Sequence, residues 1–253
     1  MPAGRGAEGQ LNRIVATRHG LARALSKRGL CSRTQAAEWV RAGRVRVDGR
    51  IVRDPEFPTI QGVSRIVVDG TNLDSSAATR RYLMLNKPRG LVTTARDEQG
   101  RDTVYRCFDE TDFGWIAPVG RLDKASEGLL LFSNDPAWAA RITDPGTGPD
   151  KTYHVQVDRI PVEAELQSMR DGVECEGEGL RAESASLLRT GDRNAWLEIV
   201  LDEGRNRQIR RLLEALDIRV LRLVRVAIGG LRLGELPKGQ WRELTAEEIE
   251  VLS

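Results

Sequence analysis

The sequence contains few of the residues on which metal and nucleophile chemistry most often depends. It has only two histidines, His19 and His154, and three cysteines, Cys31, Cys107 and Cys175. The cysteines are far apart and show no CxxC spacing, and two histidines leave little material for a metal site or a Ser/His/Asp triad. We therefore expect buried free thiols and no metal site. Catalysis must depend on carboxylates, basic groups or tyrosines.

Long apolar segments are also absent. No run approaches the roughly 18 to 20 residues that span a bilayer, and residues 1–10 lack the apolar core of a signal peptide. With 40% hydrophobic and 30% charged residues, the composition is typical of a soluble globular protein. A chain of 253 residues forms one large domain or two smaller ones. We expect a cytoplasmic protein with two domains and no membrane contact.

Positive charge is concentrated near the N-terminus. Residues 11–53 carry eleven Arg and Lys residues against Glu38 and Asp48, a net charge of +9, although the whole chain carries only +2. Clustered cations gain affinity for polyanions by releasing counterions from phosphates. The asymmetry indicates a polyanion-binding module joined to a different kind of domain. The alternative is a basic face that is merely solvated.

The first 75 residues predict a small α/β domain that follows a disordered tail at residues 1–10. Apolar residues recur at helical intervals over 21–28 and 32–42, and Ser32 with Gln35 fits a capping box. Residues 44–52 alternate basic and apolar side chains around Asp48-Gly49, which predicts a hairpin. A strand at 65–70 and a polar linker at 71–79 follow, so we place the domains at 11–75 and 76–253.

The second domain is predicted to be a mixed, largely antiparallel α+β fold, because many consecutive strands lack an intervening helix. Helices are expected near 136–142, 161–171 and 206–216. Strands are expected at 82–86, 91–94, 115–119, 128–133, 153–157, 184–189, 196–201 and 219–228.

Three segments of this domain could carry chemistry. GRLDKASEGLLLFSND (120–135) places a polar loop between two apolar runs. Asp123 in this loop either forms a turn or acts as one of a pair of hydrolase carboxylates, with Glu127 or Asp135 as the other. EGRNRQIRR (203–211) leads a glycine turn into an arginine-rich helix, which contacts either phosphate or only solvent. KTYHVQV (151–157) carries Tyr153, which packs in the core or stacks on a base.

In this order and spacing the three segments closely resemble the catalytic, tyrosine and arginine motifs of the RsuA-like family of ribosomal RNA pseudouridine synthases. The closing RVAIGGLRLGELPKGQWREL resembles the family's usual ending, and LARALSKRGLCSRTQAAEWVRAGRVRVDGRIV resembles its S-four-like RNA-binding domain. The similarity covers most of the chain, without departure at the three principal positions. It implies an isomerase that detaches uracil from ribose, rotates it and rejoins it through carbon five, without a cofactor.

The resemblance also assigns roles to individual residues. Asp123 is the expected catalytic carboxylate, Arg210 the cation that orients it, and Tyr153 the ring that stacks on the flipped base. For the orienting cation, helical periodicity alone equally favours Arg207. It implies a monomer that acts on ribosomal RNA or a pre-ribosomal particle, of either subunit. Phosphate contacts are expected from six cations of the N-terminal domain: Arg23, Lys27, Arg28, Arg33, Arg44 and Arg46.

Two other classes of protein compete with this hypothesis. A non-catalytic RNA-binding or ribosome-assembly factor would not need all of Asp123, Tyr153 and Arg210. A carboxylate-pair glycoside hydrolase would need a second acid such as Glu127 and aromatic side chains that stack on sugars, whereas aromatics make up 5% of the chain.

Overall fold

The computed structural model describes residues 18–60, 64–73, 79–95, 97, 99–108, 111 and 113–252. The described residues form two compact units. Residues 18–26 and 31–73 belong to the first, and residues 27–30 and those from residue 79 onward belong to the second. The tail expected at residues 1–10, most of the linker and the boundary expected near residue 75 lie outside the described residues. Among those described, no helix has the length and apolar character needed to cross a membrane.

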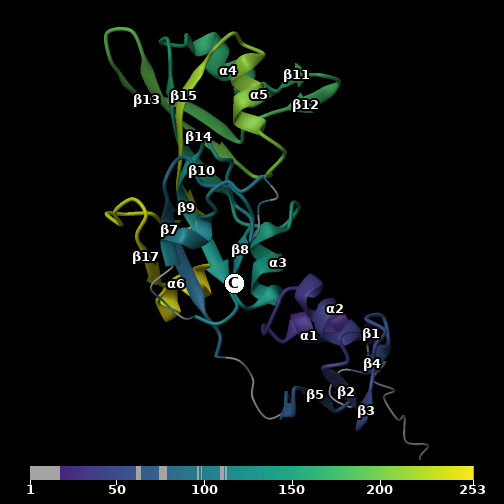
Figure 1. Ribbon diagram of the computed structural model, residues 1–253. Helices are drawn as coiled ribbons and strands as arrows, with labels where there is room; N and C mark the ends of the chain where they lie inside the picture. Colours follow the sequence, from purple (N-terminus) through teal and green to yellow (C-terminus); the bar gives the residue numbers. More distant parts are fainter. Residues whose placement is uncertain are drawn as a thin grey trace, which may run out of the picture. The chain divides into compact units, whose positions relative to one another are not determined.

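The first unit packs two helices against a small sheet (Figure 1). Ser32 caps the second helix by accepting a hydrogen bond from the Gln35 backbone N–H, as the sequence predicts. Asp48 and Gly49 both have positive φ, 49° and 82°, which is the geometry of a tight hairpin turn. The elements are β1 (Arg18–Gly20), α1 (Leu21–Lys27), α2 (Arg33–Arg41), β2 (Val45–Val47), β3 (Arg50–Ile51), β4 (Pro58–Ile60), β5 (Ile66–Val68) and β6 (Thr71–Asn72).

The second unit is built on a nine-stranded mixed sheet of order β13-β14-β10-β15-β9-β7-β17, which β8 and β16 extend by pairing with β9 and β15. All its pairings are antiparallel except that of β15 with β9. The α+β prediction is therefore confirmed. The strands are β7 (Tyr82–Lys87), β8 (Ala117–Val119), β9 (Glu127–Ser133), β10 (Lys151–Val157), β13 (Ser184–Thr190), β14 (Ala195–Leu201), β15 (Val220–Ile228), β16 (Leu231–Arg232) and β17 (Trp241–Glu243).

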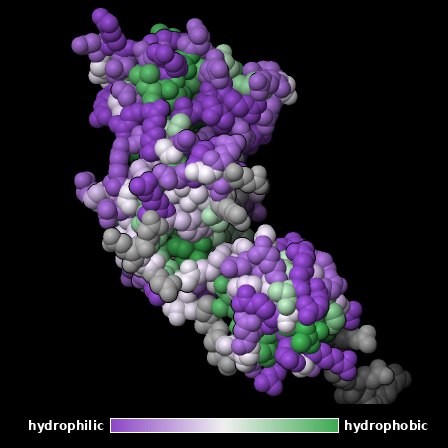
Figure 2. All heavy atoms as spheres, in the orientation of Figure 1, coloured by the Kyte–Doolittle hydropathy of each residue, from purple (hydrophilic) through white to green (hydrophobic). Residues whose placement is uncertain are grey.

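Helices and a short hairpin complete this unit. The helices are η1 (Val104–Phe108), α3 (Pro136–Thr143), α4 (Glu163–Asp171), α5 (Gln208–Glu214) and α6 (Ala246–Val251), and the hairpin is β11 (Val173–Cys175) with β12 (Glu178–Leu180). Helices α4 and α5 cover one face of the outer strands, where Leu166, Leu197 and Leu212 share a buried cluster. In Figure 2 the visible surface here is mostly hydrophilic, with an apolar area over β13 and α4.

The strand predicted at 91–94 is wrong. Only Val92 forms a bridge, a single parallel one with Thr103. The hydroxyl of Thr93 instead donates to the backbone oxygen of Leu122 at 2.7 Å. This segment therefore supports the loop that carries Asp123.

Candidate active site

Asp123 lies in the loop between β8 and β9, where the chain leaves one core strand and enters another. The loop is closed by a turn in which the Ser126 N–H donates to the Asp123 backbone oxygen at 3.0 Å. Leu122, next to Asp123, is buried in the core. The backbone contacts and the buried neighbour fix the position from which the half-buried Asp123 carboxylate projects.

A completely buried lysine binds the backbone of this loop through hydrogen bonds. Lys87, the last residue of β7, donates from its Nζ to the backbone oxygens of Asp123 at 3.2 Å, Ser126 at 2.8 Å and Pro88 at 3.1 Å. Burial lowers the pKa of Lys87 to about 8, although the nearby Asp123 charge favours the ammonium form. Three carbonyl acceptors match the three hydrogens of an ammonium group, so Lys87 ties the loop to β7.

A strained residue directly precedes the helix of the arginine motif. Helix α5 starts at Gln208, not at the predicted residue 206, because Arg207 has a left-handed backbone with φ of 50°. The buried Gln208 side chain donates to the Arg181 backbone oxygen and to Glu203, and accepts from the Arg205 N–H. These contacts hold Arg207 in a conformation that non-glycine residues seldom adopt.

Arg210 contacts the Asp123 loop but not the carboxylate itself. Its Nη2 donates to the Ala125 backbone oxygen at 3.3 Å. Burial and the neighbouring charge of Arg207 lower the pKa of Arg210, whereas Asp123 favours its charged form. Within the described residues, no ion pair joins Arg210 to Asp123. Arg210 thus lies close enough for electrostatic coupling to Asp123 and is hydrogen-bonded to the loop two residues further on.

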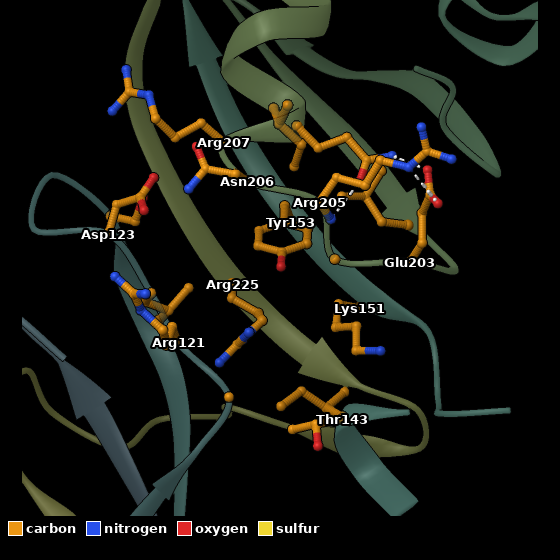
Figure 3. A pocket seen from close by; sticks show the side chains of 18 of the residues that line it. Arg121, Asp123, Thr143, Lys151, Tyr153, Glu203, Arg205, Asn206, Arg207 and Arg225 are labelled. Atoms are coloured by element: carbon orange, nitrogen blue, oxygen red, sulfur yellow. Dashed lines mark hydrogen bonds and ion pairs between the residues drawn. The ribbon is translucent and has the colours of Figure 1, made fainter. Parts of the chain in front are cut away.

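Asp123 and Tyr153 line one open cavity of about 630 Å³. Figure 3 shows Tyr153 near its centre, with Asp123, Arg121 and Arg207 to one side in this view. Lys151 lies on the other side of Tyr153 in this view, and Arg225 lies between Arg121 and Lys151. Tyr153 pairs with Arg225 across β10 and β15, so both side chains leave the same face of the sheet. A second cavity of about 560 Å³ shares Arg121, Leu122, Asp123 and Arg207 with the first.

The other carboxylates of the 120–135 segment have structural partners. Glu127 is 3% exposed and forms ion pairs with Arg222 at 3.0 Å and with Lys238. Asp135 caps α3 by accepting from the Ala137 and Trp138 N–H groups. Neither residue lines the cavity. The structure therefore does not place Glu127 or Asp135 beside Asp123 as the second carboxylate of a glycoside hydrolase.

Glu127→Gln should lower stability without removing activity. Burial alone would raise the pKa of Glu127, but hydrogen bonds from Arg222 and Lys238 outweigh it and the pKa is lowered. The ordinary pKa of a glutamate is 4.5, so the ion pairs stabilise the fold fully at pH values above it. This contribution is lost as the pH falls through the lowered pKa of the folded state. We expect a loss of about 1–3 kcal/mol at pH 7, which shrinks in acid. Urea unfolding of the wild type and of Glu127→Gln from pH 7 to pH 3 measures this loss of stability.

The six candidate phosphate contacts lie on or next to helices α1 and α2 and strand β2. Arg23 and Lys27 belong to α1 and Arg28 follows it; Arg33 begins α2, and Arg46 is on β2. Arg33 and Arg44 have acidic partners: Arg33 pairs with Glu56, and Arg44 pairs with Asp69 and lies over the ring of Trp39. Both pairs are exposed, so they compete weakly with a phosphate.

One residue of the site escapes a motif search. Lys87 is a single cation at the end of an apolar strand, and its contacts join segments far apart in the chain. Lys151 and Arg225 lie in recognisable segments, but only the sheet register shows that they line the same cavity. The one sequence feature that indicates a structural role for Lys87 is its position at the end of an apolar strand, immediately before Pro88. Such a side chain must either turn outward or find partners inside.

Comparison with known proteins places this site in a family. The family described as RNA pseudouridylate synthase matches residues 81–215, and the S4 domain matches residues 20–58. A crystal structure of a pseudouridylate synthase superposes with a TM-score of 0.66 at 31% identity, over 93% of this chain and 100% of the other. The chain belongs to the RNA pseudouridylate synthase family and carries an S4 domain.

Curated relatives refine this assignment. The ribosomal large subunit pseudouridine synthase B of Bacillus subtilis is 34% identical over 92% of this chain and 94% of its own length. The protein of the same name from Haemophilus influenzae is 36% identical over 92% of this chain and 66% of its length. The protein is therefore an isomerase of the RsuA-like type that acts on RNA, as its sequence motifs indicate.

Proposed function

We propose that this enzyme converts a uridine of ribosomal RNA into pseudouridine, with Asp123 as the essential carboxylate. The curated relatives named for the large ribosomal subunit support its RNA as the first substrate to test, either free or in a pre-ribosomal particle. The family resemblance further favours action as a monomer.

One observation carries the proposal more than any other. Asp123, Tyr153 and Arg207 come from three separate segments and line the same open cavity. A carboxylate, an aromatic ring and cations are the groups needed to hold and transform a nucleotide. Asp135 and Glu127, the carboxylates that the sequence offered as partners of Asp123, do not line this cavity.

The proposed reaction breaks the bond between uracil N1 and ribose C1′ and forms a bond between C5 and C1′. The hydrogen leaves C5 as a proton, N1 gains one, and the product has the same atoms as the substrate, so the chemistry itself needs no redox cofactor. Asp123 begins the reaction by attack on the base, attack on C1′ or removal of a ribose proton. Each of these routes needs an ionised carboxylate in a fixed position, which the loop contacts provide.

The other groups position the nucleotide. The half-buried Tyr153 ring presents its face to a base that has left the RNA stack, which costs a few kcal/mol in lost stacking. Arg210 holds the Asp123 loop through Ala125, and Arg207 adds positive charge at the cavity edge. Phosphate contacts made by these cations and by the S4 domain offset the cost of flipping.

Release of tritium from carbon five tests the function directly. RNA fragments of both ribosomal subunits, labelled at C5 of uridine, are incubated with the wild-type protein. Bond formation at C5 must expel the label, so release identifies both the activity and the subunit. Tight binding to every fragment without release, in free RNA and in ribosomal particles alike, would instead support a non-catalytic assembly factor.

A cation of the S4 domain should contribute affinity without sequence preference. Arg46→Gln removes an exposed charge from β2 while Val45 and Val47 stay buried, so the fold is preserved. We expect weaker binding to all RNAs and a slope of log Kd against log salt that is smaller by about 0.7 to 0.9. Fluorescence anisotropy over a salt series measures both, with Arg219→Gln, an exposed change on the other unit, as control. A changed target uridine at unchanged affinity would contradict this role.

A further inference from the structure

Arg225 is a buried cation that lacks part of its hydrogen bonding. The residue is 5% exposed, and its Nε donates to the Leu129 backbone oxygen at 2.7 Å, which anchors the guanidinium between β15 and β9. Its Nη2 is buried and has no hydrogen-bond partner, yet the residue lines the cavity. A buried charged donor without an acceptor is strongly unfavourable. An acceptor supplied by a ligand would satisfy it.

A second cation faces the same part of the cavity. Lys151 and Tyr153 are two residues apart on β10 and therefore point to one side of the sheet, where Tyr153 pairs with Arg225. Burial and the positive charge of Arg225 lower the pKa of Lys151, whereas Asp150 and Asp202 favour its charged form. No ion pair of the described residues engages either Lys151 or Arg225. Two cations thus line one cavity, and no ion pair among the described residues neutralises either charge.

We propose that Arg225 and Lys151 form a phosphate subsite, which binds a phosphodiester group next to the uridine held by Tyr153. This rests on the proposed function, because it assumes that a nucleotide enters the cavity. Uracil is neutral and would leave the repulsion of two cations uncompensated, whereas a phosphodiester offers a negative charge and two free oxygens. In Figure 3 both side chains lie beyond the hydroxyl end of Tyr153, with the Arg225 guanidinium turned toward Arg121 and the Lys151 amine on the other side. The subsite would hold the backbone while Asp123 acts on the base or sugar.

Binding of mononucleotides tests the subsite without turnover. Uridine, uridine 5′-monophosphate and uridine 3′-monophosphate are titrated into the full-length protein, and their affinities are measured by ligand-observed NMR. The wild type should bind one monophosphate on the order of tenfold more tightly than uridine. Lys151→Gln, a half-buried change that leaves Arg225 in place, should lose most of this preference, and Arg232→Gln, an exposed change outside the cavity, should retain it. Equal affinity for all three compounds would overturn the subsite.

Activity on RNA with one neutral linkage gives a second, independent test. A methylphosphonate replaces each phosphate around the modified uridine in turn. In the wild type, one position should reduce kcat/KM by about 10- to 100-fold. Arg225→Gln should lose a similar factor on normal RNA and little more on that modified RNA, because both changes remove the same contact. A merely structural role for Arg225 predicts losses that multiply.

A failure of the proposed function can be distinguished from a failure of the phosphate subsite. If the wild type prefers a monophosphate but releases no tritium from any RNA, the proposed function fails and the subsite stands. If it releases tritium but Arg225→Gln and Lys151→Gln remain fully sensitive to every methylphosphonate, the function stands and the subsite fails. Thermal unfolding of each variant shows whether Arg225→Gln has lost its fold, in which case Lys151→Gln decides.

Discussion

Asp123→Asn should abolish pseudouridine formation while leaving the fold intact. The change keeps the shape of the side chain, and the turn that closes the loop uses the Asp123 backbone oxygen, so neither the turn nor the Lys87 contacts depend on the carboxylate. Loss of the reacting carboxylate should reduce tritium release by roughly 10⁴-fold or more. RNA affinity should change little, because the phosphate contacts remain.

Asp135→Asn is the matched control for this prediction. It makes the same chemical change twelve residues further along the same motif, at a helix cap where asparagine also functions. Activity within a few-fold of wild type is expected. Similar tritium release from the Asp123 and Asp135 variants would exclude Asp123 as the essential group, and a loss in Glu127→Gln as large as that in Asp123→Asn would restore the paired-carboxylate chemistry.

Local patterns predicted those parts of the fold that local interactions determine. The Asp48-Gly49 hairpin, the Ser32 cap and helix α4 follow from turn chemistry and periodicity that neighbouring residues satisfy among themselves. The hairpin of β11 and β12 was not predicted. Its turn places Glu176 at φ 53° and Gly177 at φ 82°, and glutamate gives little sequence indication of such a turn.

The candidate site was only partly accessible from sequence, because motifs report contiguous residues and the cavity is assembled from distant strands. Asp123, Tyr153 and Arg210 each lie in a recognisable segment. Arg222 and Arg225 are three residues apart on β15, and only the sheet register shows that Arg222 pairs with Glu127 whereas Arg225 meets Tyr153. The left-handed Arg207 likewise depends on the distant backbone oxygen to which Gln208 is bound.

Lys87→Met should cause the largest loss of stability among single changes near the site. The variant leaves the carbonyl oxygens of Asp123, Ser126 and Pro88 without their shared donor in the interior. Part of this loss is offset because methionine avoids burying a charge, so we expect about 2–4 kcal/mol. A loop that shifts by about 1 Å should also reduce kcat by roughly 100-fold. Urea unfolding and tritium release measure the two effects.

The pH dependence of stability distinguishes the buried ammonium from a general packing effect. The pKa of Lys87 is about 8 in the fold and 10.5 ordinarily, so between these values the unfolded chain binds a proton that the folded chain does not. Stability contributed by this group therefore rises with pH across that window and is constant below it. The deficit of Lys87→Met relative to wild type should widen from pH 8 to pH 10, whereas Lys124→Met, which removes an exposed lysine from the same loop, should follow the wild type throughout. A deficit that stays constant from pH 7 to pH 10 would contradict a lowered pKa of Lys87 in the fold.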